Sequence, residues 1–370
     1  MMKNIIEGYL DLVVNNLIHL ENQDDLANEF VNVSAKEAEK QGFFARDFGM
    51  EEWDWPQGVG LFGLSQNLEK NGSYIVNWAK AEIEKGLPTK NINTICPLIS
   101  LMEFKEFEQL SLEWMEWIDN DFPRTDERGL QHITSGNDKF SIRLNEGQIW
   151  IDTLFMTALF IGKMGKKYNN QKWINDSQCQ FLLHTKYLVD RESGLFYHGW
   201  DFTDNSNFGG NFWCRGNSWF TMAVPLYLRY LGDQLPVSIK DYLANIYVNQ
   251  VNGLVKYRGE DKLWHTIIND NSSYTETSGS SGIISGIYMG IEQGLLKAEE
   301  FESFCQESID ALISRIDEKG TVLGVSAGTA ISNNKEDYKN IITAPMAYGQ
   351  AMMICALTEC LNYHKQKGQQ

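Results

Sequence analysis

The sequence feature that most constrains the fold is a repeat of apolar segments with the 3.6-residue period of an α-helix. About twelve such segments follow one another, separated alternately by short turns and long polar loops. Short turns are expected at Asn71-Gly72-Ser73, Gly232-Asp233 and Gly294-Leu295. The predicted helices are 4–20, 57–71, 73–86, 94–103, 105–119, 149–166, 170–188, 216–231, 237–250, 280–296, 298–317 and 346–364.

The even-numbered helices begin at irregular but comparable intervals, which indicates decorated copies of one helical hairpin. In a closed ring, every hairpin is buried against its neighbours and the inner helices all begin around one opening. We therefore predict an all-α toroid of paired helices, in a single domain spanning residues 1–370. The alternative is an open α-solenoid, but its repeats would be shorter and more regular.

Composition limits the partners. The formal net charge of −17, without a cluster of Lys or Arg, opposes binding to nucleic acid or an anionic membrane. No apolar run approaches the length of a membrane span. A small molecule or an oligosaccharide is the expected partner, because 11 Trp and 15 Tyr offer flat faces for sugar rings. The same aromatic residues would also serve simply to pack wide helices.

The cysteines and histidines show no metal-binding pattern. The 6 Cys lack zinc-ligand spacing and mostly fall inside apolar helices, and the 6 His form no His-x-x-x-His pair. We therefore expect no metal site. The apolar residues of segment 1–20 lie on one helical face, unlike a secretion signal, and free cysteines suit a reducing compartment. The expected location is therefore the cytoplasm.

Polar, aromatic or glycine-rich motifs stand at the starts of the even-numbered helices. Any one of them can be explained by helix capping. Their recurrence around one ring instead predicts a shared site at its mouth. The motifs are Trp53-Asp54-Trp55-Pro56-Gln57-Gly58, Asn91-Ile92-Asn93-Thr94, Trp150-Ile151-Asp152-Thr153, Trp213-Cys214-Arg215-Gly216-Asn217-Ser218-Trp219, Thr277-Ser278-Gly279-Ser280-Ser281-Gly282 and Ala347-Tyr348-Gly349-Gln350.

Asp152 is a carboxylate in an apolar stretch, between Trp150 and Phe155. Desolvation raises the pKa of a carboxyl group, which would keep it protonated as a general acid. Alternatively, Asp152 caps its helix and stays ionised. A conventional glycosidase also needs a second carboxylate, and spacing does not rank the candidates. These are Asp54, Asp201 and Glu276.

Arg215 stands between Trp213 and Trp219, where a guanidinium group can bind a carboxylate while indole faces hold a ring. This combination suits an acidic sugar. The alternative is a structural arginine paired with a carboxylate of a neighbouring loop. His198 and His132 lie in long loops of the same predicted rim and are expected to donate hydrogen bonds to substrate.

Five motifs, taken together and in this order, resemble the unsaturated rhamnogalacturonyl hydrolases of glycoside hydrolase family 105. The resemblance runs from about residue 40 to the last helix, and the combination is specific although no single motif is. The motifs are Arg46-Asp47-Phe48-Gly49, Glu52-Trp53-Asp54-Trp55-Pro56-Gln57-Gly58-Val59-Gly60, Trp150-Ile151-Asp152-Thr153-Leu154-Phe155-Met156, Phe196-Tyr197-His198-Gly199-Trp200 and Arg215-Gly216-Asn217-Ser218-Trp219.

The resemblance implies an (α/α)6 barrel without metal or cofactor, acting on an unsaturated galacturonyl residue linked to rhamnose, as left by pectin lyases. Such a sugar is a vinyl ether. The family implies that Asp152 protonates the double bond, water adds to the resulting cation, and the hemiketal collapses. By the same resemblance, Arg215 with Trp213 and Trp219 would hold the uronate, and His198 and His132 would contact the sugars. The other predicted sugar-binding residues are Asn93, Trp53 and Asn217.

One departure from the family pattern leaves the second catalytic role open. Related unsaturated-uronyl hydrolases place an Asp at the start of the fourth helix, where this chain has Asn93. Asn93 can orient the sugar or a water molecule, but it cannot act as a base near neutral pH. Two alternatives therefore stand beside the leading hypothesis. One is the same chemistry on an algal or arabinogalactan-derived sugar, and the other is a non-catalytic sugar-binding protein.

Overall fold

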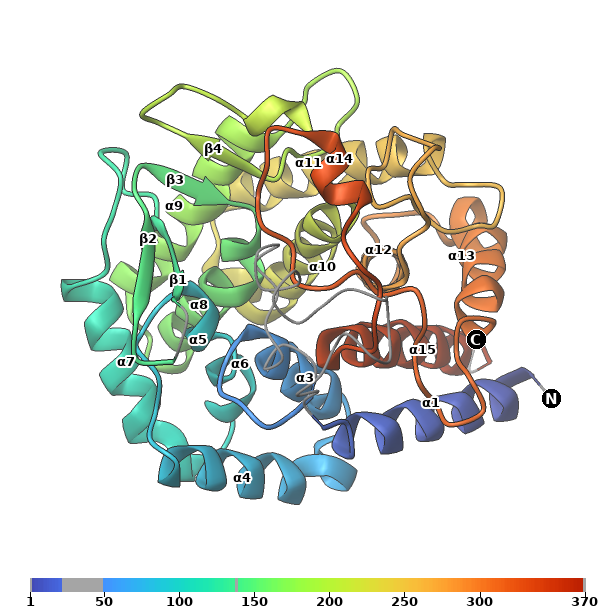
Figure 1. Cartoon of the computed structure of the whole chain (residues 1–370), viewed down its shortest axis with the longest axis horizontal. Coiled ribbons are helices and arrows are strands. Elements are labelled where there is room, and N and C mark those ends of the chain that lie inside the picture. The colour runs from blue at the N-terminus through green and yellow to red at the C-terminus, as the bar shows by residue number, and fades with distance from the viewer. Residues whose placement is uncertain (1, 22–48, 137–138, 369–370) are drawn as a thin grey trace.

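The computed structural model describes residues 2–21, 49–136 and 139–368. Arg46, Asp47 and Phe48 of the first family motif lie outside the described residues. Figure 1 shows helices arranged as two concentric rings around a central axis.

The inner ring is closed. Each of its members packs against the next, and the last one, α15, packs against α3. This closure excludes the open solenoid and confirms the predicted all-α toroid. In chain order the inner helices are α3 (Trp55–Ser65), α5 (Ile92–Ile95) with α6 (Leu98–Leu101), α8 (Leu159–Lys167), α10 (Cys214–Leu231), α12 (Thr277–Glu292) and α15 (Ala347–Lys367).

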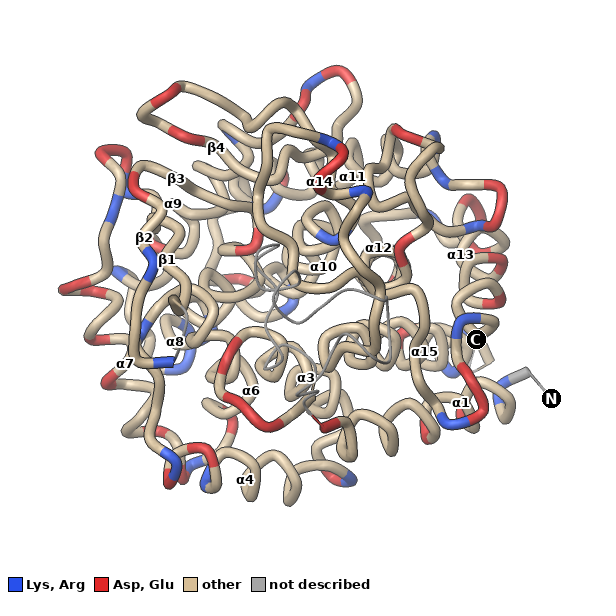
Figure 2. The backbone as a smooth tube through the Cα atoms, viewed as in Figure 1, with Lys and Arg blue, Asp and Glu red and all other residues tan. Residues whose placement is uncertain are grey.

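The outer helices run beside their inner partners, and α1 packs against α15 so that the two ends of the chain meet. Each outer helix buries one face and exposes the other, and its acidic and basic residues are interspersed on the outside (Figure 2). The outer helices are α1 (Met2–Ile18), α4 (Leu68–Glu84), α7 (Glu108–Asn120), α9 (Gln171–Leu188), α11 (Val237–Lys256) and α13 (Ala298–Ile313).

Small residues allow the inner helices to approach closely. Helix α12 is buried from Thr277 to Gly290. A Cβ atom on Gly286 would lie 2.3 Å from the Thr221 carbonyl oxygen of α10, and one on Gly279 would lie 2.5 Å from Cys214 Sγ. The glycine and serine motif at this helix start therefore serves the packing of α12 against α10.

The turn expected at Asn71-Gly72-Ser73 was wrong, because these residues lie inside α4. The chain instead turns at Asn67, whose side chain caps α4 by accepting a hydrogen bond from the Lys70 N–H at 3.1 Å. The Asn71 side chain is buried and donates to the Leu64 carbonyl at 2.9 Å. A polar residue that looks like a turn signal in the sequence thus ties two helices together.

Two other predicted helices are interrupted. Pro97 divides 94–103 into α5 and α6, because proline lacks the N–H that a continuous helix needs. The segment 149–166 begins as a strand, continues as a π-helical turn, η4 (Leu154–Ala158), and only then becomes α8. The other predicted helices are present, with ends shifted by a few residues.

The loops add two small antiparallel sheets on the side where the inner helices begin (Figure 1). Strand β1 (His132–Ser135) pairs with β2 (Ile142–Asn145), and β3 (Gln148–Trp150) pairs with β4 (Gly199–Asp201). Further short helices are η3 (Lys105–Phe107), η5 (Phe208–Gly210), η6 (Gly232–Gln234) and α14 (Lys335–Lys339). Within the described residues, no helix is both long and apolar enough to cross a membrane.

Candidate active site

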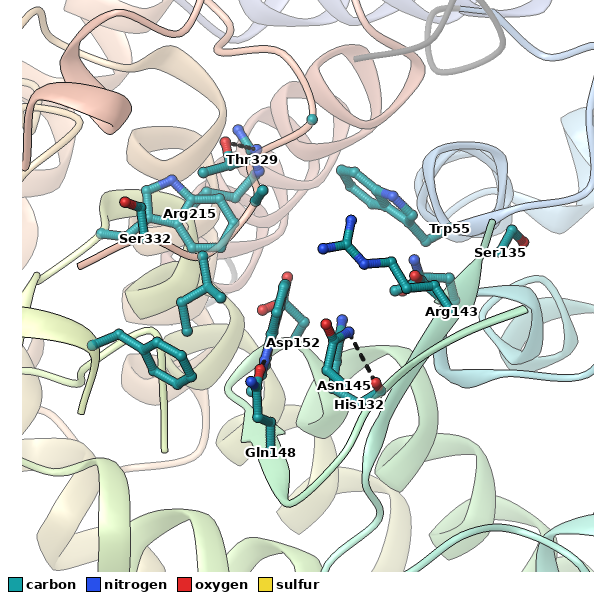
Figure 3. Close-up of a pocket in the computed structure, with 18 of the residues that line it drawn as sticks. Trp55, His132, Ser135, Arg143, Asn145, Gln148, Asp152, Arg215, Thr329 and Ser332 are labelled. Atoms are coloured by element: carbon teal, nitrogen blue, oxygen red, sulfur yellow. Dashed lines mark hydrogen bonds between the residues drawn. The ribbon is translucent and has the colours of Figure 1, made fainter. Parts of the chain in front are cut away.

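A cavity of about 670 Å³ opens where the inner helices begin (Figure 3). Its wall combines helix starts with the two small sheets and with a segment of the long α13–α15 connection, residues 328–334, which we call the 328–334 segment. The lining residues are Asp54, Trp55, Asn93, His132, Thr134, Ser135, Gly136, Arg143, Asn145, Gln148, Trp150, Asp152, Phe208, Trp213, Arg215 and residues 328–334.

The structure brings five of the predicted site residues to this cavity. They are Asp152, Arg215, Trp213, His132 and Asn93. His198 lies directly behind Asp152 and is 1% exposed. The remaining three, Trp53, Trp219 and Asn217, are not part of the lining.

Those three residues support the wall from behind. Trp53 donates its indole N–H to the Thr94 carbonyl at 2.8 Å, which fixes the start of α3 beside α5. Trp219 is fully buried one helical turn below Arg215 and packs edge-on against Trp55. Asn217 accepts from the N–H of Phe196 at 2.8 Å and donates to its carbonyl at 2.9 Å. It therefore holds the loop that carries His198.

Asp152 and His198 are held together by the ladder between β3 and β4. The Ile151 N–H donates to the His198 carbonyl at 2.9 Å, which extends the ladder to the residue before Asp152. His198 Nε2 lies 3.5 Å from Asp152 Oδ2, and the Asp152 side chain is 17% exposed. The π-helical turn η4 follows directly, a distortion that is frequent at functional sites.

The charge state of Asp152 differs from the one favoured by its apolar sequence neighbours. Burial raises the pKa of Asp152, but the interaction with His198 and the proximity of His132 outweigh burial and lower the pKa overall. The carboxyl group of the unliganded protein is therefore ionised at neutral pH. The lowered pKa depends chiefly on His198, which comes from another segment of the chain.

The two histidines are uncharged at neutral pH. Burial lowers the pKa of His132 to about 3, although Asp152 acts in the opposite direction. The ring of His132 is stacked on Trp150, with centroids 3.8 Å apart and planes inclined by 7°. Burial also lowers the pKa of His198, whose ring lies 4.2 Å from that of Trp213. The Asp152 carboxylate at the floor of the cavity thus lies near two neutral imidazoles, His132 in the lining and His198 behind it.

Arg215 lines the cavity, but both of its terminal nitrogens donate to the protein. Nη1 contacts the Ser326 carbonyl at 3.0 Å, and Nη2 contacts the Ala327 carbonyl at 3.1 Å and Thr329 Oγ1 at 2.9 Å. Its charge faces the fully buried Glu276 across 3.8 Å. These contacts match the structural alternative for Arg215, in which a loop carboxylate pairs with the guanidinium group.

Sequence patterns did not single out Arg143. It projects from β2 into the cavity between Trp55 and Asn145 (Figure 3). Its side chain is exposed and has no ion pair with any residue that the structure describes. In the sequence, the only signal for Arg143 was its place in the long loop 120–148. The pairing of β1 with β2, which brings Arg143 to the rim of the cavity, is seen only in the structure.

Of the three candidates for a second carboxylate, Asp54 alone is part of the lining. It caps α3 by accepting the Trp55 N–H at 2.8 Å. Asp201 instead accepts hydrogen bonds from Gln148 and from two backbone N–H groups of its own turn. Glu276 is buried against Arg215 and caps α12. No cluster of potential metal ligands occurs among the described residues.

Comparisons with known proteins agree with the family indicated by the five sequence motifs. A family model described as Glycosyl Hydrolase Family 88 matches residues 24–364. The unsaturated rhamnogalacturonyl hydrolase YesR of Bacillus subtilis is 31% identical over 336 residues, covering 87% of this chain and 92% of the relative. An unsaturated 3S-rhamnoglycuronyl hydrolase of Alteromonas is 26% identical over 58% of this chain and 52% of its own length.

Among solved structures, a protein from Salmonella enterica described as a possible member of family GH105 superposes with a TM-score of 0.86. It is 30% identical, and the match covers 98% of this chain and 95% of the Salmonella chain. The glycosidase family predicted from the five motifs is therefore confirmed by a relative described as a possible member of family GH105, and this chain is a glycoside hydrolase that belongs to the family described as Glycosyl Hydrolase Family 88.

Proposed function

We propose that the protein removes the unsaturated galacturonyl residue from rhamnogalacturonan-derived disaccharides. One observation carries the proposal: an ionisable carboxyl group, Asp152, stands at the floor of a sugar-sized cavity and contacts His198. The similarity to YesR over most of the chain supports the same substrate class.

The proposed chemistry uses the C4=C5 double bond of the sugar. Asp152 transfers a proton to C4, and the ring oxygen stabilises the positive charge that develops at C5. Water adds to C5 and returns a proton to the Asp152 carboxylate. The resulting hemiketal collapses and releases rhamnose. Asp152 thus acts first as an acid and then as a base.

In this proposal, two groups of the cavity wall orient the attacking water. Asn93 and Asp54 both line the cavity at neighbouring helix starts, and the Trp53 indole ties these two starts together. Asn93 contributes hydrogen bonds only, whereas Asp54 offers a carboxylate. We therefore assign to Asp54 the part that a second Asp plays in related enzymes.

A panel of unsaturated disaccharides from different lyases tests the substrate. The conjugated alkene absorbs ultraviolet light, so its disappearance reports turnover directly. We expect the fastest loss with galacturonyl-rhamnose. Binding of this disaccharide without loss of absorbance would instead favour the sugar-binding alternative.

The lowered pKa of Asp152 predicts a particular pH dependence. Protonated Asp152 is the reacting form, so kcat/KM should fall as pH rises through the pKa of Asp152 in the free enzyme. The bound uronate is an anion, and a nearby anion raises the pKa of a carboxyl group. The alkaline limb of kcat should therefore lie at higher pH than that of kcat/KM. Rate profiles that extend below about pH 4, the ordinary range of a carboxyl pKa, and up to about pH 9 check this order, and coincident limbs would contradict it.

Arg143 supports binding of an anionic sugar. The terminal nitrogens of Arg215 are occupied, which leaves Arg143 as the exposed cation of the described lining. An anionic group on either sugar of the disaccharide would pair with the Arg143 guanidinium. The similarity to the Alteromonas enzyme supports a substrate with a charged rhamnose as the second candidate.

Replacing Arg143 by glutamine should raise KM about fivefold to tenfold, because one partly exposed charge-assisted hydrogen bond is lost. Little change in kcat is expected. Steady-state kinetics at low and high salt measure the effect, which should shrink as salt rises. Arg191→Gln, at an exposed arginine outside this cavity, is the control. Equal KM values for the two variants would remove Arg143 from the binding site.

A further inference from the structure

Tyr338 links the 328–334 segment of the cavity wall to His198, which lies beside Asp152. It lies on the short helix α14, and its side chain is fully buried against Trp213 and Ile267. Its hydroxyl oxygen is 2.8 Å from His198 Nδ1. The same oxygen accepts the backbone N–H of Ser332, at 3.2 Å, and Ser332 belongs to the 328–334 segment.

These contacts determine the direction of the hydrogen bond to His198. A tyrosine hydroxyl has one proton to donate, and an imidazole with one proton has one donor and one acceptor nitrogen. Within the described residues, His198 Nδ1 is the acceptor available to the Tyr338 hydroxyl, because its other partner, the Ser332 N–H, is a donor. The hydroxyl therefore donates to Nδ1, and the imidazole proton resides on Nε2.

The electrostatics at Nε2 favour the same tautomer. His198 Nε2 faces the Asp152 carboxylate across 3.5 Å. An N–H at this nitrogen is attracted to the carboxylate, whereas a lone pair would be repelled by it. The positive charge of Arg215 opposes protonation of the whole ring, and the nearby His132 is itself neutral. Uncharged imidazole with its proton on Nε2 satisfies all these groups.

We propose that Tyr338 is a positioning residue that holds His198 in the Nε2–H tautomer and so keeps a proton on the ring nitrogen that lies 3.5 Å from the Asp152 carboxylate. The tautomer is a property of the free protein, and its effect on turnover rests on the proposed function. In the first step, the Nε2–H stabilises the carboxylate that Asp152 becomes when it releases its proton. The Ser332 N–H orients the Tyr338 hydroxyl. The 328–334 segment of the cavity wall therefore also helps to fix the contact between Tyr338 and His198.

Tyr338→Phe removes the hydroxyl and keeps the aromatic ring. We expect kcat to fall about tenfold, equivalent to about 1.4 kcal/mol in the barrier, with less than about threefold change in KM. In Tyr247→Phe, the control, an equally buried tyrosine loses a hydroxyl that donates to the Gly286 carbonyl at 2.7 Å, away from the cavity. This control should lose some stability and keep its kcat.

Nitrogen-15 NMR on histidine-labelled protein reads the tautomer without substrate, with His198→Gln identifying the signals. In the wild type we expect a protonated Nε2 and an unprotonated Nδ1. In Tyr338→Phe we expect the Nδ1–H tautomer to appear beside the Nε2–H form, which Asp152 continues to favour. In Tyr247→Phe, the wild-type pattern should remain.

A proton on Nδ1 of His198 in the wild type would overturn the proposal, even if Tyr338→Phe did not fold. An unchanged tautomer and an unchanged kcat in a folded Tyr338→Phe would overturn it as well. If instead the expected tautomer is observed but no unsaturated disaccharide is turned over, the proposed function fails and the role of Tyr338 in holding the tautomer stands.

Discussion

Replacing Asp152 by asparagine should lower kcat by about 1000-fold or more, because the amide cannot transfer a proton to the alkene. Asparagine keeps the shape of the side chain and a hydrogen-bonding oxygen beside His198. The substrate should therefore still bind, with KM changed by less than about tenfold. Loss of the alkene absorbance measures kcat, and titration calorimetry with the disaccharide measures binding.

The matched control is Asp201→Asn, in the strand that pairs with β3. Asp201 is buried and accepts hydrogen bonds from Gln148 and nearby backbone, but it does not line the cavity. A general disturbance of this small sheet would lower the rate in both variants. A wild-type rate in Asp152→Asn, or an equal loss in Asp201→Asn, would contradict the catalytic assignment of Asp152.

Replacing Arg215 by methionine should reduce the free energy of unfolding by about 3–5 kcal/mol, because it leaves the charge of Glu276 buried without a counter-ion. Both side chains of this pair are fully buried. Glu276 would retain the N–H groups of Ser278, Gly279 and Ser326, but no positive charge. Urea unfolding followed by circular dichroism measures the loss.

A double variant separates the structural role of Arg215 from a role in binding. Arg215→Met with Glu276→Gln removes both charges and should recover part of the stability lost in the single variant. A stable Arg215→Met protein with a strongly raised KM would instead make this arginine the ligand of the uronate. Both terminal nitrogens of Arg215 are bound to the protein. We therefore predict the loss of stability in the single variant and its partial recovery in the double variant.

The helical period was sufficient to predict the toroid, because each inner helix buries nearly its whole length and each outer helix buries one face. It did not place the ends of every helix. Asn71 looked like a turn residue, but its side chain reaches the Leu64 carbonyl from inside α4. The β3–β4 pairing joins residues about fifty positions apart, and no local pattern encodes such a distant partner.

The helix-start motifs located the cavity but did not predict the orientation of each side chain. Asp152, Asn93 and Trp213 line it, whereas Trp219 lies one turn deeper than Arg215 and is enclosed by the core. Arg143 and the 328–334 segment reach the cavity through loop folding alone. Tyr338 is 140 residues from His198 in sequence, so their contact is visible only in the folded chain.

The charge state of Asp152 likewise could not be predicted from its neighbours in the sequence. Its apolar neighbours in sequence correctly indicate burial, which raises the pKa of a carboxyl group. The groups that reverse the direction of the shift, His198 and His132, come from a loop and from the β1–β2 hairpin. The charge state of Asp152 therefore depends on residues that only the folded chain brings close to it.

The central claim is that the reaction proceeds by hydration of the double bond and not by displacement at the glycosidic carbon. The most direct test compares rhamnose release from unsaturated galacturonyl-rhamnose with release from the same disaccharide carrying a saturated galacturonyl residue. A vinyl ether is needed for protonation by Asp152, so we predict release from the unsaturated sugar alone. Comparable release from the saturated disaccharide would contradict this account and would indicate conventional two-carboxylate displacement.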